Sequence, residues 1–76
     1  MAKGAFAWCQ KAAEHGYADS QYMLGLYYME GYGVEQDDKQ SLAWLKKAGA
    51  QGHALALEVE QELLQKLEKS GANGLK

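Results

Sequence analysis

The side chains of this chain that are capable of acid–base, metal or nucleophilic chemistry are few, and its single cysteine is the first of them. Cys9 has no second cysteine with which to pair, so an internal disulfide is excluded. A reactive thiol would need a cation or a helix N-terminus beside it, and Lys11 points elsewhere if this segment is helical. We therefore expect Cys9 to act as a small buried hydrophobic residue.

The histidines and acidic residues also lack the spacing of a site. His15 and His53 are the only histidines, they flank glycines near loops, and we expect both to be solvated. Glu35, Asp37 and Asp38 lack the pattern of a calcium-binding loop, and helix capping by Asp37 or Asp38 explains them better. We predict no catalytic residue, no cofactor and no metal ligand, and hence no enzyme.

The charge and hydrophobicity of the chain limit the kinds of molecule that it could bind and the compartment in which it could act. The net charge is −2, so the chain has no overall positive charge that would attract nucleic acid. Hydrophobic residues make up 47% of the chain, too many for a disordered protein, yet no apolar run is long enough to span a membrane. The first residues lack the apolar segment of a signal peptide. Because a longer parent protein could be secreted or periplasmic, the compartment stays open.

The spacing of apolar residues predicts four helices joined by short loops. They are expected at about 5–15, 19–30, 39–50 and 55–69, with glycines between them and a frayed tail after Lys69. Asp19 is expected to cap the second helix. The segment from Tyr22 to Met29 is apolar nearly all round, which indicates burial on more than one side. No strand pattern is present, so the fold class is all-α, built from antiparallel helical hairpins.

Two stretches of the chain repeat each other at an offset of 36 residues. The matched pairs are Ala7 and Ala43, Trp8 and Trp44, Lys11 and Lys47, Ala12 and Ala48, Gly16 and Gly52, and Ala18 and Ala54. A helical-hairpin period in the mid-thirties is typical of stacked repeat arrays, in which each hairpin buries its apolar faces against its neighbours. We expect the repeated tryptophans and alanines to be packing residues. We have no account from the sequence of why the lysine recurs.

These residues resemble the Sel-one-like repeat, a relative of the tetratricopeptide repeat. The resemblance covers Ala5 to about Ala54, and the positions that carry the architecture are Trp8, Ala12, Gly16, Leu24, Gly25, Tyr28, Gly31, Gly33, Trp44, Ala48 and Gly52. It implies a solenoid of stacked αα-hairpins in which Gly25 lets a partner helix approach closely. Family members serve as protein-interaction adaptors and scaffolds.

The register of the repeat gives the organisation of a single domain, residues 1–76. Residues 5–16 form the second helix of a partial repeat, 18–52 one complete repeat, 54–70 a C-terminal capping helix and 71–76 a tail. The fourth helix departs from the pattern, because Glu60 and Gln61 stand where Leu24 and Gly25 stand one period earlier. Its polar outer face suits a cap. Docking of that helix onto another chain is the alternative.

The first helix has no upstream partner in this sequence. The side that carries Phe6, Trp8 and Cys9 is therefore expected to be bare. Because arrays usually need about three repeats for stability, the chain is either a piece of a longer array or self-associates through this end.

The resemblance places a partner-binding groove on the second helix. Gln21, Leu24, Gly25 and Tyr28 form its inward set, and the groove candidates on the opposite side are Tyr22, Leu26 and Met29, with Asp19, Met23 and Glu30 at the margin. The competing interpretation is that these side chains pack against the fourth helix or a neighbouring unit. The corresponding functional alternatives are a partner-binding module and a purely structural capping fragment of a longer solenoid.

Overall fold

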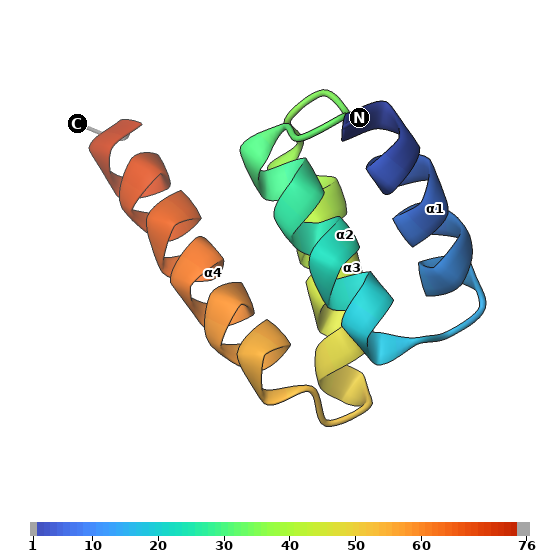
Figure 1. Cartoon of the computed structure of the whole chain (residues 1–76). Coiled ribbons are helices and arrows are strands. Elements are labelled where there is room, and N and C mark those ends of the chain that lie inside the picture. Colours follow the sequence, from blue (N-terminus) through green and yellow to red (C-terminus); the bar gives the residue numbers. More distant parts are fainter. Residues whose placement is uncertain (1, 75–76) are drawn as a thin grey trace.

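A computed structural model describes the backbone of residues 2–74 and the side chains of residues 4–69. Over this range the chain forms α1 (Ala2–Glu14), α2 (Ala18–Glu30), α3 (Asp38–Ala50) and α4 (Ala54–Gly74), and no strand. Each helix packs against the next along the chain, so α2 and α3 lie between α1 and α4 (Figure 1). The predicted all-α stack of antiparallel hairpins is confirmed.

The ends of the central hairpin follow from local sequence. Gly31 adopts the left-handed conformation at φ 72°, and its N–H donates to the Tyr27 carbonyl, which ends α2. Asp37 caps α3, since its Oδ1 accepts the backbone N–H groups of Lys39 at 3.0 Å and Gln40 at 3.2 Å. The prediction that Asp37 or Asp38 caps this helix is therefore confirmed, with Asp37 as the cap.

Two expectations about helix ends are wrong. Asp19 does not cap α2, because the cap position is Tyr17, no side chain bonds there, and Asp19 lies within the first turn. The predicted tail does not begin after Lys69, because α4 continues as helix to Gly74. The remaining tail residues, 75 and 76, lie outside the described residues.

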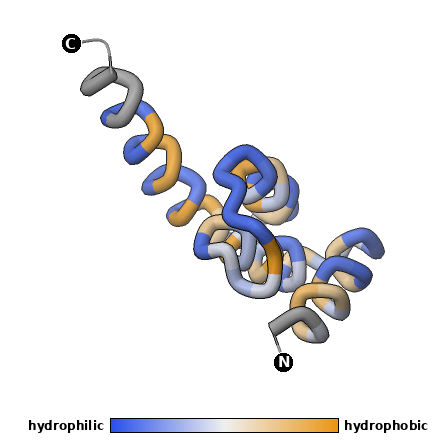
Figure 2. The backbone as a smooth tube through the Cα atoms, turned by 90° about the horizontal axis from the view of Figure 1, so that it is seen from above, coloured by the Kyte–Doolittle hydropathy of each residue, from blue (hydrophilic) through white to orange (hydrophobic). Residues whose placement is uncertain are grey.

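One side of α4 is apolar and packs against α3. Ala56 and Leu63 are fully buried against α3, and Val59 and Leu67 pack beside them. Hydrophobic and hydrophilic segments alternate along α4 in Figure 2, as expected of a helix with one buried side.

The core consists of two clusters of buried side chains. One contains Cys9, Ala13 and Leu24 and holds α1 against α2; the other contains Leu45, Ala48, Ala56 and Leu63 and holds α3 against α4. The helix α2 contributes to both, because Leu24 belongs to the first cluster while Tyr22 and Met29 pack against the second. This double contact is the physical reason that its sequence is apolar nearly all round.

The helices α2 and α3 approach each other closely at Gly25. A Cβ atom at Gly25 would lie only 2.7 Å from Cγ of Leu45, a side chain with no exposed surface. The buried Ser41 hydroxyl uses the same approach to donate to the Gly25 carbonyl at 2.7 Å. The close packing expected at Gly25 is thus confirmed, and a hydrogen bond accompanies it.

The two repeated tryptophans differ in burial. Trp44 is half-buried and packs against the cluster that contains Leu24. Trp8 is 74% exposed, so the expectation that it is a packing residue is wrong, and the expectation that it is bare is confirmed. Phe6 and Cys9 were expected to be bare with it and are not, because Cys9 is 6% exposed and Phe6 packs against its cluster. Lys47, one of the two recurring lysines, places its Nζ 4.5 Å from the centre of the Trp44 ring in a cation–π contact.

Candidate functional site

The six groove candidates on α2 do not share one surface. Tyr22 and Met29 pack against the buried cluster of α3 and α4, in the way that the competing interpretation anticipated. Asp19, Met23 and Glu30 remain exposed. The accessible candidates therefore lie on the sides of α2 that α4 leaves uncovered.

A hollow of about 320 Å³ lies between α1 and α2, and we call it the α1–α2 hollow. Its lining residues are Ala5, Trp8 and Cys9 from α1 and Asp19, Ser20, Met23 and Tyr27 from α2. The two most exposed large side chains of this lining are Trp8 and Met23, which are 74% and 39% exposed. The lining is mostly apolar, and the Asp19 carboxylate supplies a charge.

Cys9 lies in this hollow but is a poor nucleophile. Its Sγ donates to the Ser20 carbonyl at 3.1 Å, which ties the two helices together. Burial raises the pKa of the Cys9 thiol, so the thiolate is disfavoured at neutral pH. The expectation of a small buried residue is confirmed.

A second hollow of about 380 Å³ lies at the C-terminal end of α2, and we call it the α2 C-terminal hollow. Leu26, Tyr27, Glu30 and Tyr32 line it, and the rings of Tyr27 and Tyr32 are 5.1 Å apart between centres. Because Tyr27 lines both hollows, they adjoin. Together they form one surface along α2, which we call the α2 surface.

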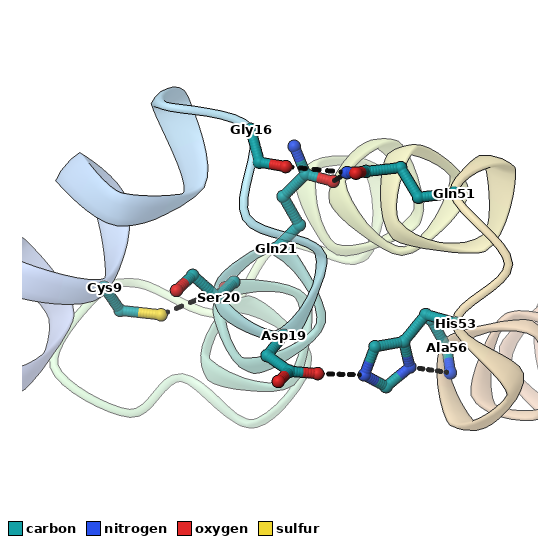
Figure 3. A network of polar contacts seen from close by, with 8 residues as sticks. All are labelled: Cys9, Gly16, Asp19, Ser20, Gln21, Gln51, His53 and Ala56. Carbon is teal, nitrogen blue, oxygen red and sulfur yellow. Dashed lines mark hydrogen bonds and ion pairs between the residues drawn. The ribbon is translucent and has the colours of Figure 1, made fainter.

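A network of side-chain amides fixes the other side of α2 (Figure 3). The buried Gln21 amide donates to the Ala13 carbonyl at 3.1 Å. Gln51, at the end of α3, donates to the Gln21 Oε1 at 3.0 Å and to the Gly16 carbonyl at 2.9 Å. Through these bonds α1, α2 and α3 are tied together at one end of the stack.

His53 is part of the structure that holds α4, contrary to the expectation that it is solvated. Its side chain is 13% exposed and stacks on Tyr22 with 4.7 Å between ring centres. The Ala56 N–H donates to Nδ1 at 3.2 Å, so the proton lies on Nε2, which donates to Asp19 Oδ1 at 2.9 Å (Figure 3). Histidine is not a preferred capping residue, and sequence rules for helix starts therefore miss this role.

The two hollows offer apolar contact area along α2. Within residues 4–69, no three His, Cys, Asp or Glu side chains lie close enough to hold a metal ion. None of the helices of the described part of the chain is long and apolar enough to cross a membrane. What the α2 surface can do chemically is bury apolar and aromatic side chains of another molecule between two carboxylates, Asp19 and Glu30.

Comparison with known proteins gives one family. The family model described as Sel1 repeat matches residues 2–17 and 18–53. The first match contains α1 and the second contains α2 and α3, so both follow the helical hairpin register, and α4 lies beyond them. No solved structure matches the chain significantly.

Proposed function

The chain belongs to the Sel1 repeat family, and we propose that it is an adaptor module that binds a segment of another protein along α2. The family is a non-catalytic type of helical repeat whose members generally mediate protein–protein interactions. Within this chain we place the binding on the α2 surface, formed by the two adjoining hollows.

The observation that carries this proposal is the accessible apolar area on the α2 surface. Trp8, Met23 and Tyr32 are large side chains exposed by 74%, 39% and 48%, and all three line the two hollows. Aromatic residues and methionine are enriched where proteins meet, because they give large contact areas and adapt their packing. Side chains of this kind, gathered around two adjoining hollows along α2, favour a binding surface.

The charges at the ends of the α2 surface indicate the chemistry of the partner. Asp19 borders the α1–α2 hollow and Glu30 borders the α2 C-terminal hollow. A segment with apolar side chains in its middle and lysine or arginine at its ends would complement this arrangement. Strongly acidic segments are disfavoured.

The test is a comparison of two variants that each place a charge on an exposed apolar residue. The immobilised chain is used to capture partners, which mass spectrometry identifies, and the purified partner is then titrated into labelled chain by NMR. Met23→Asp should abolish capture, whereas Leu55→Asp, on an exposed residue of α4, should retain it. If the partner shifts only α4 resonances, or if both variants capture it equally, binding along α2 is refuted.

The alternative function, a structural cap of a longer solenoid, is favoured by one feature of α4. That helix buries Ala56 and Leu63 against α3 while Gln61, Glu62 and Lys66 are exposed, which is the polarity that a terminal helix needs. A cap without a binding role would have no partner on the α2 surface. The titration above separates the two functions, because a pure cap leaves every α2 resonance unmoved.

A further inference from the structure

The two carboxylates of the α2 surface differ in what they already bind. Oδ1 of Asp19 accepts the Nε2–H of His53 at 2.9 Å. Glu30 is exposed, and its side chain takes part in none of the ion pairs or hydrogen bonds found among the side chains of residues 4–69. Of the two, Glu30 is therefore the carboxylate whose charge a partner can meet without displacing a contact between these side chains.

The backbone at this end of α2 adds to the negative charge of Glu30. The C-terminal end of a helix carries a partial negative charge, so cations stabilise it and anions destabilise it. The last turn of α2 contains no basic residue, and Glu30 is the last residue of the helix. A bound cation would therefore interact favourably with both the carboxylate and the helix end.

A pair of tyrosine rings lies beside this charge. Tyr27 and Tyr32 line the α2 C-terminal hollow together with Leu26 and Glu30, and their ring centres are 5.1 Å apart. Tyr27 is half-buried and packs against the core cluster between α1 and α2, which holds the ring pair in place, whereas Tyr32 is 48% exposed. The face of an aromatic ring attracts a cation within about 6 Å of its centre, and an apolar surface such as that of Leu26 covers the aliphatic stem of a long cationic side chain.

We propose that the α2 C-terminal hollow binds an arginine side chain of the partner segment, with its guanidinium paired to the Glu30 carboxylate and stacked on the Tyr32 ring. The site rests on the proposed function, because it specifies the residue with which the partner binds one end of the α2 surface. A guanidinium is planar, so it forms two parallel hydrogen bonds to a carboxylate and stacks on an aromatic ring, whereas a lysine ammonium acts as a point charge. The volume of about 380 Å³ lies near the lower end of the range for ligand pockets, about 300–1,000 Å³, which suits a single side chain.

The hollow stays accessible whether or not further repeats flank the chain. The helix α4, on the following side, packs against the other flank of α2 and leaves the hollow open. A preceding unit would cover on α2 the side that α2 and α3 cover on α4. At the offset of 36 residues, Leu26 and Glu30 correspond to Glu62 and Lys66, and both of these are exposed. The proposed site therefore does not depend on what precedes α1.

The experiment titrates the full chain with short peptides of defined sequence. The probe is a capped peptide with leucine at both ends and a single arginine between two alanines. Two matched peptides carry lysine or citrulline in place of the arginine, and citrulline keeps the shape of the side chain but not its charge. Backbone amide shifts of the isotope-labelled chain, followed by NMR at Glu30 and Tyr32, give the dissociation constant of each peptide.

We expect the arginine peptide to bind with shifts confined to residues around the hollow. The citrulline peptide should bind about tenfold more weakly, because it loses both the ion pair and the cation–π contact. The lysine peptide should be intermediate, because it keeps the charge but not the planar group.

Variants of the chain separate the two contacts, and all of them change exposed side chains. Glu30→Gln should weaken binding of the arginine peptide about threefold, whereas Glu62→Gln, on an exposed glutamate of α4, should leave it unchanged as a matched control. Tyr32→Leu should also weaken binding about threefold, whereas Tyr32→Phe, which keeps the ring, should retain it.

Three results would overturn the arginine site. They are no shift of the Glu30 and Tyr32 amides at millimolar peptide, equal affinities for the arginine and citrulline peptides, and equal losses from Glu30→Gln and Glu62→Gln, which would indicate attraction to the net charge alone.

The proposed function has its own test in the partner titration, so the two can fail separately. If the captured partner shifts α2 resonances but keeps its affinity when its arginines are replaced by glutamine, the proposed function stands and the arginine site fails. If the arginine peptide binds as described while the partner shifts only α4 resonances, the site stands and binding of that partner along α2 fails.

Discussion

Replacement of Gly25 by alanine tests the packing of α2 on α3 most directly. The new Cβ would lie 2.7 and 2.8 Å from Cγ and Cδ2 of Leu45 and 3.3 Å from the Ser41 carbonyl oxygen. Leu45 is fully buried and the carbonyl belongs to the backbone, so neither can move away freely. Overpacking of this kind costs about 1–3 kcal/mol.

The same substitution also favours the helix, and the two effects must be weighed. Alanine is better than glycine inside a helix by about 1 kcal/mol. Because the new Cβ would meet a buried side chain and a backbone oxygen, we expect the steric cost in the upper part of its range, about 2–3 kcal/mol, and a net loss in the free energy of unfolding of about 1–2 kcal/mol. For a domain of this size, that corresponds to a fall in melting temperature of about 4–16 °C.

Two other helical glycines, Gly4 and Gly49, provide a graded control. Gly4 has no atom within 4 Å of a new Cβ, so Gly4→Ala should leave the melting temperature equal or higher. At Gly49 the Cβ would meet Cδ2 of Leu57 at 2.6 Å, but Leu57 is 44% exposed and can rotate away, so Gly49→Ala should be intermediate.

The assay is thermal and urea unfolding followed by circular dichroism for the three variants in parallel. The expected order of stability is Gly4→Ala, then Gly49→Ala, then Gly25→Ala. If Gly25→Ala melts at or above the temperature of Gly4→Ala, then α2 and α3 are not as close as described, and the steric reasoning is refuted.

Three further perturbations test other contacts. In urea titrations, Trp44→Ala should lower the free energy of unfolding by about 2 kcal/mol, which is less than for a fully buried tryptophan because Trp44 is half-buried. Trp8→Ala should change the free energy of unfolding by less than about 0.5 kcal/mol, because Trp8 is exposed. Equal losses for the two variants would contradict the observed burial. His53→Ala should cost about 1–2 kcal/mol and speed hydrogen exchange of the Ala56 amide, and an unchanged exchange rate would show that His53 does not cap α4. Burial raises the pKa of the Cys9 thiol above its ordinary 9.0, so at high pH the folded chain keeps a proton that the unfolded chain loses. The free energy of unfolding of the unmutated chain should therefore fall relative to that of Cys9→Ala as the pH rises past 9. Parallel pH profiles of the two proteins would refute this.

The candidate site was only partly predictable. The sequence places Tyr22, Leu26 and Met29 on one side of α2, with Met23 at its margin, but it does not say where α4 lies. Once α4 is seated on α3, it covers Tyr22 and Met29 and leaves Met23 accessible. Spacing on a helix fixes which residues share a face, whereas the neighbour that covers this face depends on the angle between helices.

Residues that act outside the local pattern were the least predictable. His53 and Asp19 are 34 positions apart and meet only because α4 begins beside the first turn of α2. No spacing rule anticipates such a pair. Conversely, Asp37 acts within three residues of its own position, and the sequence alone identified its role as a cap.

The sequence by itself determined the number of helices, their glycine-marked ends, the offset of 36 residues and the family, because each depends on residues that are near neighbours or repeat at a fixed period. For Trp8 the sequence supported two opposed expectations, a packing residue and a bare one, and only the tertiary structure decided that Trp8 is exposed while Trp44, in the same repeated motif, is half-buried. The physical reason is that a side chain on a helix is buried only where a second element covers it. The α2 helix covers α3, and the matching face of α1 has no such helix among the described residues.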